Sequence, residues 1–364
     1  MLTLPAIVAA GCSYVRALDA PGNLSVSERS VEWLRDHNFG DTVSWAEHTY
    51  YKQNQPQTGG TLAAGIPHAV VSAPAAASTT TATTVVNDSI VPIASPSLPR
   101  EGVWQPLGEV IQGSTAMQAA FLRPDAIHGA VLAAVVRIDQ TKATFRIVPG
   151  LQEPGGGPWT GGGTLPAADV PQLLAAFNSG FRLVDSRGGF FAQGHTTGEL
   201  RVGAASLVLA ADGSLNIAQW GRDASMANRP VAVRQNLDLI VDGGQLVSGL
   251  DDNAGNRWGK TVGNALYVWR SGIGIDATGR ILYVASEGLT VKTLAALLQR
   301  AGAVRAMELD INHSWVSFNT FHHGSGGVQG NKLLDGMKKS ANRYLGPDSR
   351  DFIGVVARQP LNAA

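Results

Sequence analysis

The most constraining feature of the sequence is a helix pattern between two strand patterns. Residues 290–302 begin with Thr290 as a candidate N-cap, repeat leucine on one face and end at Gly302 as a candidate C-cap. Residues 279–286 before this helix and 303–311 after it have the apolar character of buried strands. This succession predicts a right-handed crossover between two parallel strands. Functional side chains of such units gather beyond the C-terminal ends of the strands.

Turn dipeptides between alternating apolar runs predict hairpins in the same half of the chain. They are Asp212-Gly213, Asp242-Gly243 and Thr278-Gly279. Residues 130–139 and 143–150 are also predicted to pair as a hairpin. Together these patterns predict an α+β fold. Its sheets are expected to be mixed and largely antiparallel, with packed helices and one strand–helix–strand crossover leading to the strand of the candidate site.

The main domain is expected over residues 101–360, because the strand signals concentrate there. Residues 71–100 are poor in large side chains and predict a linker or a long exposed loop. An N-terminal segment precedes them over residues 13–70. In this segment Ser27 is a candidate helix N-cap and Gly40 a candidate helix end.

Residues 1–12 form a short apolar run with small residues before Cys12. The run is similar to the end of a lipoprotein export signal, although no basic residues precede it, and an ordinary apolar segment is the alternative. We therefore expect an extracytoplasmic protein, secreted or lipid-anchored. No other run approaches the roughly 20 apolar residues of a membrane span, so an integral membrane protein is not expected.

The charge balance argues against a nucleic-acid partner. Lys and Arg together number 28 and Asp and Glu together also number 28, so the chain has no overall positive field. Charged residues make up 15% and hydrophobic residues 44% of the chain, which is typical of a folded protein and not of a disordered one.

The end of the strand over residues 303–311 concentrates polar side chains. Alternation places Met307 and Leu309 on one face, where they are expected to pack under the preceding helix, and Glu308 and Asp310 on the other. Two carboxylates at this spacing lie about 6–7 Å apart. That separation is close to the roughly 6.5–9.5 Å used by inverting glycosidases. The alternative is that both carboxylates bind arginines or backbone amides.

Other candidates are weaker when taken singly. Asn178 stands at a strand end before small residues that would let a ligand approach the backbone, although a simple turn would use the same residues. Arg270 ends an apolar strand and could bind a phosphate or pair with a carboxylate. His195 could act as an acid or base or lie on the surface. The adjacent His322 and His323 lack metal-ligand spacing, so neither a metal nor a cofactor is predicted.

In this order, the segments resemble the phosphodiester glycosidase family. The family has an Asn-Gly-Gly-Phe turn, which appears here as Asn178-Ser179-Gly180-Phe181. Its arginine at a strand end corresponds to Arg270, and the helix over residues 290–302 follows. Its Leu-Asp-Gly-Gly-Gly-Ser ending corresponds to residues 309–314. The resemblance covers roughly residues 176–318.

The sequence departs from the family pattern at four glycine positions. Ser179 replaces the first glycine of the turn, and Ile311, Asn312 and His313 replace the glycines of the final motif. Glycine permits unusual backbone angles and close substrate approach, so these changes imply a reshaped pocket. The alternative is a relative that has lost catalysis.

The resemblance implies a hydrolase that cleaves the glycosidic bond of a sugar-1-phosphodiester or a related cell-wall or extracellular glycoconjugate. By this resemblance Arg270 would bind the phosphate, Asp310 would be the base or nucleophile, and Asn178 would orient the substrate. Ser314 would support Asp310 by hydrogen bonding, and Glu308 and His313 are further candidates for proton transfer. Substrate contacts are expected from Ser314, Gly180, Ser179, His195 and Trp315.

Two other functions remain open from the sequence. The first is a non-catalytic glycan- or wall-binding protein on the same scaffold, with Trp315, Trp159 and Trp258 stacking on sugars. The second is a metal-dependent phosphodiesterase, which would cleave the P–O bond instead of the C–O bond.

Overall fold

A computed structural model describes residues 4–72, 89–155, 157–259, 262 and 266–361. Most of the predicted linker over residues 71–100 lies outside the described residues. The helices of the N-terminal segment are α1 (Leu4–Asp19), α2 (Val26–Leu34), a π-helical turn η1 (Arg35–Phe39) and α3 (Gly40–Gln53). The main domain adds α4 (Leu183–Ser186) and α5 (Val291–Arg300).

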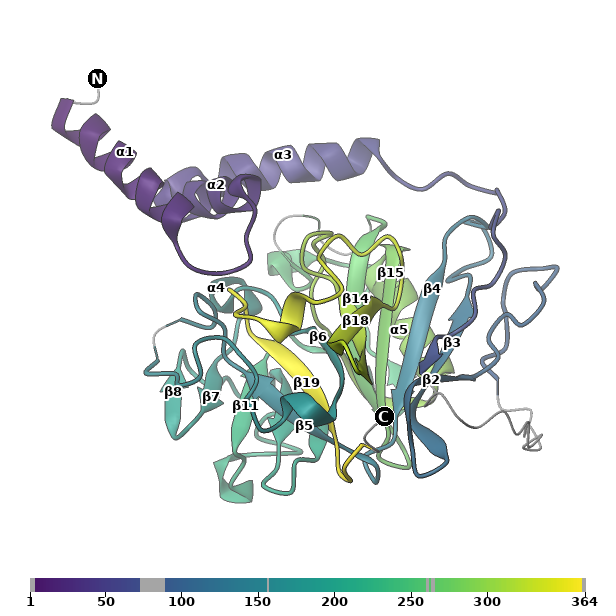
Figure 1. Cartoon of the computed structure of the whole chain (residues 1–364). Helices are drawn as coiled ribbons and strands as arrows, with labels where there is room; N and C mark the ends of the chain where they lie inside the picture. Colours follow the sequence, from purple (N-terminus) through teal and green to yellow (C-terminus); the bar gives the residue numbers. More distant parts are fainter. Residues whose placement is uncertain (1–3, 73–88, 156, 260–261, 263–265, 362–364) are drawn as a thin grey trace.

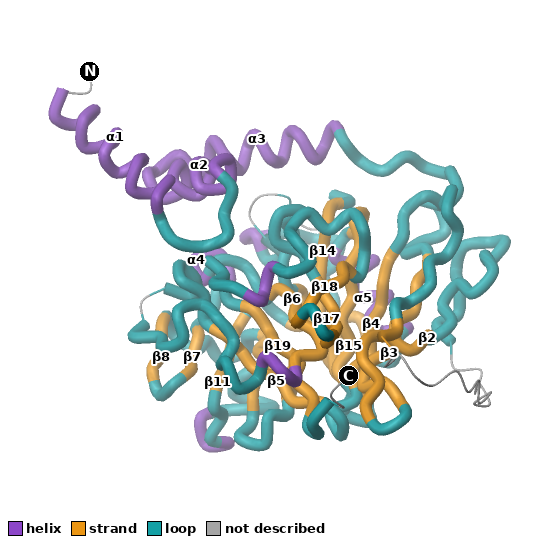
Figure 2. The backbone as a smooth tube through the Cα atoms, viewed as in Figure 1, coloured by secondary structure: helices purple, strands orange, loops and turns teal. Residues whose placement is uncertain are grey.

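The strands of the described residues form three sheets (Figures 1 and 2). The nine-stranded sheet has the order β1 (Val71–Ser72), β2 (Gln105–Ile111), β3 (Ser114–Leu122), β4 (Ala133–Ile138), β15 (Ile281–Leu289), β14 (Val268–Asp276), β16 (Ala303–Glu308), β12 (Leu239–Asp242) and β13 (Gln245–Leu246). A five-stranded sheet has the order β10 (Leu215–Gln219), β9 (Ala205–Leu209), β11 (Ala232–Gln235), β7 (Phe190–Ala192) and β8 (His195–Thr197). The other has the order β18 (Gly327–Lys332), β17 (Phe318–Gly324), β6 (Leu173–Asn178), β19 (Phe352–Ala357) and β5 (Ala143–Val148).

The predicted α+β class with largely antiparallel sheets is confirmed. Among these named strands β1 pairs parallel with β2, and the other hydrogen-bonded neighbours are antiparallel. The main hydrophobic core draws buried residues from all three sheets. A second core lies beneath α5.

The predicted crossover is present as β15, α5 and β16. β14 lies between the two strands and is antiparallel to both, so β15 and β16 run parallel. The Thr290 hydroxyl accepts a hydrogen bond from the backbone of Thr293 and caps α5. Gly302 follows the helix with φ +100°, a conformation that favours glycine and ends the helix. The end of β16 is therefore placed as the sequence predicted.

The face of β16 that meets α5 differs from the prediction. Ala303 and Ala306 pack against α5 in the second core, whereas Met307 and Leu309 belong to the main core. The expectation that Met307 and Leu309 lie under the helix was therefore wrong. From Arg305 to Leu309 period-two alternation separates the two faces, whereas a register shift between Ala303 and Arg305 puts Ala303 on the same side as Ala306. Alternation also does not say which face a helix covers when both are buried.

The three predicted turn dipeptides connect hairpins, as expected. They join β9 to β10, β12 to β13 and β14 to β15. The hairpin predicted for residues 130–139 and 143–150 is wrong. β4 pairs with β3 and β15, while β5 pairs with β19 in another sheet. A buried strand pattern does not identify its partners, and here the short connection passes from one sheet to the next.

The N-terminal helices lie together over one end of the sheets (Figure 1). The N-cap of α2 is Ser25, which forms a capping box with Glu28, and not Ser27. Gly40 is the first residue of α3 and not a helix end. Within the described residues, no helix is long and apolar enough to cross a membrane.

We predict that Leu298→Ala lowers the free energy of unfolding by about 2–5 kcal/mol, because it opens a cavity under α5. Leu298 is fully buried in the second core. Urea unfolding followed by circular dichroism measures the change. Val202→Ala is the control, since Val202 is 74% exposed and its truncation should stay within about 0.5 kcal/mol of wild type. Equal stabilities for the two variants would contradict this packing.

Candidate active site

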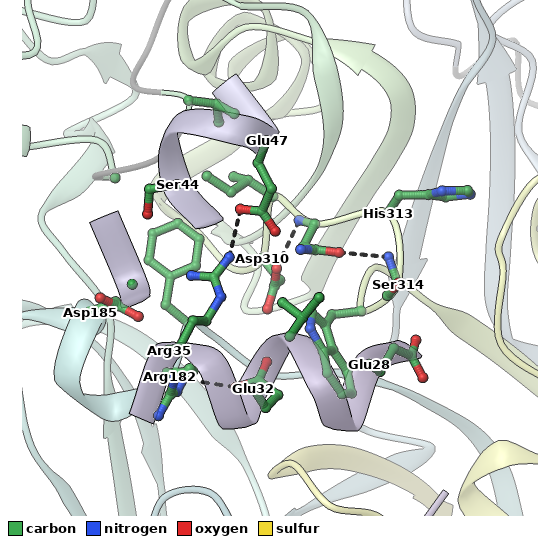
Figure 3. Close-up of a pocket in the computed structure, with 18 of the residues that line it drawn as sticks. Glu28, Glu32, Arg35, Ser44, Glu47, Arg182, Asp185, Asp310, His313 and Ser314 are labelled. Carbon is green, nitrogen blue, oxygen red and sulfur yellow. Dashed lines mark hydrogen bonds and ion pairs between the residues drawn. The ribbon is translucent and has the colours of Figure 1, made fainter. Parts of the chain in front are cut away.

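Asp310 lies just beyond the end of β16 and lines a pocket of about 650 Å³ (Figure 3). The following loop is held by its own side chains. The Asn312 N–H donates to Oδ1 of Asp310 at 2.9 Å, and the Ser314 N–H donates to Oδ1 of Asn312 at 2.8 Å. These are two successive Asx turns. Ile311, Asn312 and His313 keep φ outside the left-handed region, so this loop does not need the glycines of the family pattern.

Asn178 lies beneath this loop and positions it. Its Nδ2 donates to Oγ of Ser271 at 2.9 Å, and its Oδ1 accepts from the Tyr283 hydroxyl at 2.9 Å. The Asp310 N–H donates to the same Ser271 Oγ at 3.2 Å, and the Ser271 N–H donates to the Asp310 carbonyl at 2.8 Å. Asn178 is 3% exposed and is not among the residues lining the pocket. The structure therefore brings Asn178 close to Asp310 as a support.

The turn after Asn178 is fixed by Asn236, which the sequence did not single out. Asn236 Nδ2 donates to the carbonyls of Glu308 and Leu309 at 2.9 and 3.0 Å, and its Oδ1 accepts from the Phe181 N–H at 3.2 Å. A Cβ at Gly180 would come within 2.9 Å of Asn236 Cγ, so glycine allows this approach. The neighbouring Ser179 is 2% exposed.

Arg270 and Glu308 form a buried ion pair. Nη1 of Arg270 is 2.6 Å from Oε1 of Glu308, and both side chains are 0% exposed. Nε of Arg270 also donates to the Leu289 carbonyl at 2.7 Å. Burial raises the pKa of Glu308 to about 7, against the opposing effect of the Arg270 charge. Neither residue lines the pocket, so the geometry indicates a structural pair on the strand that leads to Asp310.

Asp310 has the electrostatic environment of an acid–base group. Burial raises the pKa of Asp310 to about 6, while Arg350, backbone N–H groups and Arg343 oppose the rise. Nη1 of Arg350 lies 3.6 Å from Oδ2 of Asp310. The Arg350 guanidinium also stacks 4.2 Å from the ring centroid of Trp315, which is 4% exposed. A carboxylate with a pKa near neutrality beside a cation is typical of catalytic sites.

The opposite wall of the pocket comes from the N-terminal helices (Figure 3). Glu28 and Glu32 of α2 line it, together with Glu47 and Tyr51 of α3. Arg35 pairs with Glu47 at 2.6 Å within this wall. The Tyr51 hydroxyl hydrogen-bonds the backbone of His313, and burial raises the pKa of Tyr51 to about 12. None of these N-terminal residues was predicted from the sequence to belong to the site.

Residues 172–310 match the phosphodiester glycosidase family model. This match confirms the resemblance recognised in the sequence. It spans less than half of the chain and ends at Asp310. Arg350 and the N-terminal wall lie outside it. A sequence search of curated proteins finds no match.

Two solved structures are similar to this chain at low sequence identity. One is zebrafish N-acetylglucosamine-1-phosphodiester alpha-N-acetylglucosaminidase, a catalytic domain described as auto-inhibited by pro-peptide. It has 14% identity and a TM-score of 0.42, over 70% of this chain and 88% of that chain. The other is a hypothetical protein from Synechocystis. It has 17% identity and a TM-score of 0.39, over 70% of this chain and 64% of that chain.

Three further residues predicted for a phosphodiester glycosidase site, His313, Ser314 and Trp315, line the same pocket as Asp310. The His313 ring stacks on Trp269, with ring centroids 5.7 Å apart, and is directed away from Asp310 (Figure 3). The Ser314 hydroxyl accepts from Nζ of Lys338 at 3.3 Å, and the Ser314 N–H donates to Oδ1 of Asn312 at 2.8 Å. His195 is exposed in β8 and is not among the lining residues.

The three tryptophans proposed for glycan stacking do not form an exposed surface together. Trp258 is fully buried, and Trp315 is enclosed by cations of the main domain. Trp159 is half-buried and packs edge-on against Phe190. This arrangement removes the sequence argument for a binding platform built from these residues.

Arg182 and Arg350 line the pocket and were not predicted from the sequence, and the same holds for Arg35 and Lys338. The run Asp348-Ser349-Arg350-Asp351 before the apolar β19 offered a signal, because charged residues at a strand start often mark a site or a buried ion pair. Arg182 directly follows the Asn178–Phe181 turn. Its approach to Arg350 depends on tertiary structure and has no local sequence pattern.

We predict that Arg270→Met lowers the free energy of unfolding at pH 8 by about 3–5 kcal/mol, because it leaves the buried Glu308 carboxylate without the charge that compensates it. Thermal and urea unfolding at pH 8, above the raised pKa of Glu308, measure the loss. The control Asp251→Asn breaks the exposed pair with Lys292 and should change stability by less than about 1 kcal/mol. An Arg270→Met variant as stable as this control would contradict the structural role of the pair.

Proposed function

We propose that this protein is a hydrolase that cleaves the glycosidic C–O bond of a sugar-1-phosphodiester or a related cell-wall or extracellular glycoconjugate. One observation carries the proposal: the family match ends at Asp310, and this carboxylate lines a pocket beside Arg350 with its pKa raised to about 6. As the sequence suggested, we place the activity outside the cytoplasm, in a secreted or lipid-anchored protein. Cys12, the proposed lipid position, is exposed.

A phosphate leaving group reduces the need for a strong general acid. The site must instead orient the substrate, neutralise the phosphate and supply an ionised carboxylate. In our proposal water or Asp310 attacks the anomeric carbon, the C–O bond breaks, and its electron pair leaves with the phosphate monoester. When water attacks directly, Asp310 accepts its proton. When Asp310 attacks, water later cleaves the glycosyl ester and releases the same sugar.

The supporting residues have separate tasks in this proposal. Arg350 lies against Asp310 and takes the phosphate-binding role that the sequence suggested for the enclosed Arg270. Asn178 acts as a positioning residue, because its contact to Asp310 passes through Ser271. Ile311 contributes an apolar wall, since its Cδ1 approaches Gly259 near Phe181.

We predict that Asp310→Asn lowers kcat for an activated sugar-1-phosphodiester by about 10²–10⁴-fold, the contribution of a positioned acid–base group. Asparagine keeps an oxygen that can accept from the Asn312 N–H, so the loop should retain its Asx turn. Asp251→Asn, an exposed aspartate outside the pocket lining, is the control and should keep wild-type turnover.

The position of bond cleavage separates this proposal from a phosphodiesterase. Hydrolysis in ¹⁸O-labelled water should place the label in the sugar. Label in the phosphate, or an unchanged rate in Asp310→Asn, would refute C–O cleavage by Asp310. A screen of sugar-1-phosphodiesters and wall polymers identifies the substrate for these assays.

We predict that kcat/KM rises with pH between about 5 and 7. Both roles of Asp310 require the ionised carboxylate, and burial raises its pKa to about 6, so protonation below this value removes the active form. The pH profile of the wild-type protein tests the sign. A rate that increases as pH falls through 6 would instead indicate that protonated Asp310 is the active form.

A further inference from the structure

A carboxylate of the N-terminal segment lies between two arginines from distant parts of the main domain. Oε2 of Glu32 is 3.2 Å from Nη1 of Arg182, and its Oε1 is 3.0 Å from Nη2 of Arg350 (Figure 3 shows Glu32 and Arg182). Arg182 stands at the start of α4, and Arg350 precedes β19. Two guanidiniums that converge on one carboxylate form a site for an anion with paired oxygens.

This anion position borders the candidate catalytic carboxylate. The Arg350 guanidinium contacts Glu32 through Nη2 and lies 3.6 Å from Asp310 through Nη1. Glu32, Arg182 and Arg350 line the main pocket and also a second cavity of about 340 Å³. The ion pairs of Glu32 with Arg182 and Arg350 therefore lie at the boundary between the two cavities.

Ion pairs hold α2 on the main domain. Glu28 contacts Lys339 at 2.6 Å, and Asp36 of η1 contacts Arg182 at 2.6 Å. Glu28, Glu32 and Asp36 recur every four residues, which places them on one face. Among the nine residues of α2, all described, none is buried. A contact made by charge without a buried apolar face can be replaced by another anion of the same geometry.

We propose that Arg182 and Arg350 form the subsite for the phosphodiester group of the substrate, and that Glu32 occupies this subsite until that group displaces it. The identity of the substrate rests on the proposed function. A phosphodiester carries one negative charge over two non-bridging oxygens, the pattern that a carboxylate presents to arginine. An anion held there would place its ester oxygen next to Asp310.

Competition by Glu32 has a measurable consequence. The apparent affinity of a ligand falls by the fraction of molecules whose site is available. Loss of the Glu32 charge should increase this fraction, and anion binding should loosen α2 from the domain. The N-terminal segment would then respond to the ligand as a cover that the anion itself opens.

Dimethyl phosphate is a suitable probe, because it carries the phosphodiester charge without a sugar. Isothermal titration calorimetry on the full chain should show roughly tenfold tighter binding to Glu32→Gln than to wild type, from the larger available fraction. Asp19→Asn removes a negative charge from the exposed end of α1 and should keep wild-type affinity. Adding Arg182→Met to Glu32→Gln should abolish the gain.

Equal affinities of wild type and Glu32→Gln, or a gain that survives Arg182→Met, would overturn the proposal. Limited proteolysis provides a test that does not depend on the variants. Dimethyl phosphate should accelerate cleavage of the wild-type chain within residues 26–53, and unchanged cleavage would also count against displacement.

The two proposals fail separately. Dimethyl phosphate bound as expected by a protein that hydrolyses no sugar phosphodiester would refute the proposed function and leave the anion subsite intact. Asp310-dependent hydrolysis without the Glu32 effect would refute the subsite and leave the function intact.

Discussion

The hydrogen bonds between Ser271 and the end of β16 connect the sheet to the candidate site. The Leu309 N–H donates to the Ser271 carbonyl, and the Ser271 N–H donates to the Asp310 carbonyl, each at 2.8 Å. Asn178 reaches the same serine from β6, so strands of two sheets meet at this point. The buried Arg270–Glu308 pair lies one step back on the same two strands. The Asp310 carboxylate is therefore held by many fixed neighbours, the kind of positioning that the proposed reaction requires.

The pocket has two walls that are stabilised by different forces. The main-domain wall belongs to a core that draws residues from three sheets, and its geometry depends on apolar packing. The N-terminal wall has Val43 and Leu24 as buried apolar residues within residues 9–53 and relies largely on ion pairs with the domain. Apolar packing resists salt, whereas these ion pairs, whose side chains are 10–19% exposed, weaken in part as salt screens them. The two walls should therefore differ in their response to the same solution conditions.

Local patterns predicted the elements well and their neighbours less well. Thr290 and Gly302 bound α5 because capping depends on residues that are close in sequence. The pairing of β4 and β5 depends on which sheets are available, and residues 130–150 contain no information about that. The same limit applies to the site. Asp310 follows a recognisable strand, but the meeting of Arg182, Arg350 and Glu32 joins positions more than 140 residues apart.

Arg270 shows why the chemistry of a residue type is an incomplete guide. An arginine that ends a strand suits a phosphate, but the expectation that Arg270 ends its strand was wrong. Arg270 lies near the start of β14 and compensates a carboxylate that the same sheet buries. One sequence interpretation of Glu308 was that it binds an arginine, and the structure shows this contact with Arg270. Residue type alone could not separate these roles, because both use the same guanidinium–anion geometry.

The loop after Asp310 is held by hydrogen bonds from its own side chains. It therefore separates two properties that glycines would provide together, namely the backbone conformation of the loop and the space left for a ligand. Its Asx turns fix the carboxylate through Asn312 and Ser314, while Ile311 faces Gly259 and Phe181 across the pocket. Side-chain volume at position 311 can therefore change the room for a sugar ring without changing the backbone that holds the carboxylate. Under the proposed function, such a loop allows substrate preference to diverge among related proteins while the candidate catalytic carboxylate stays in place.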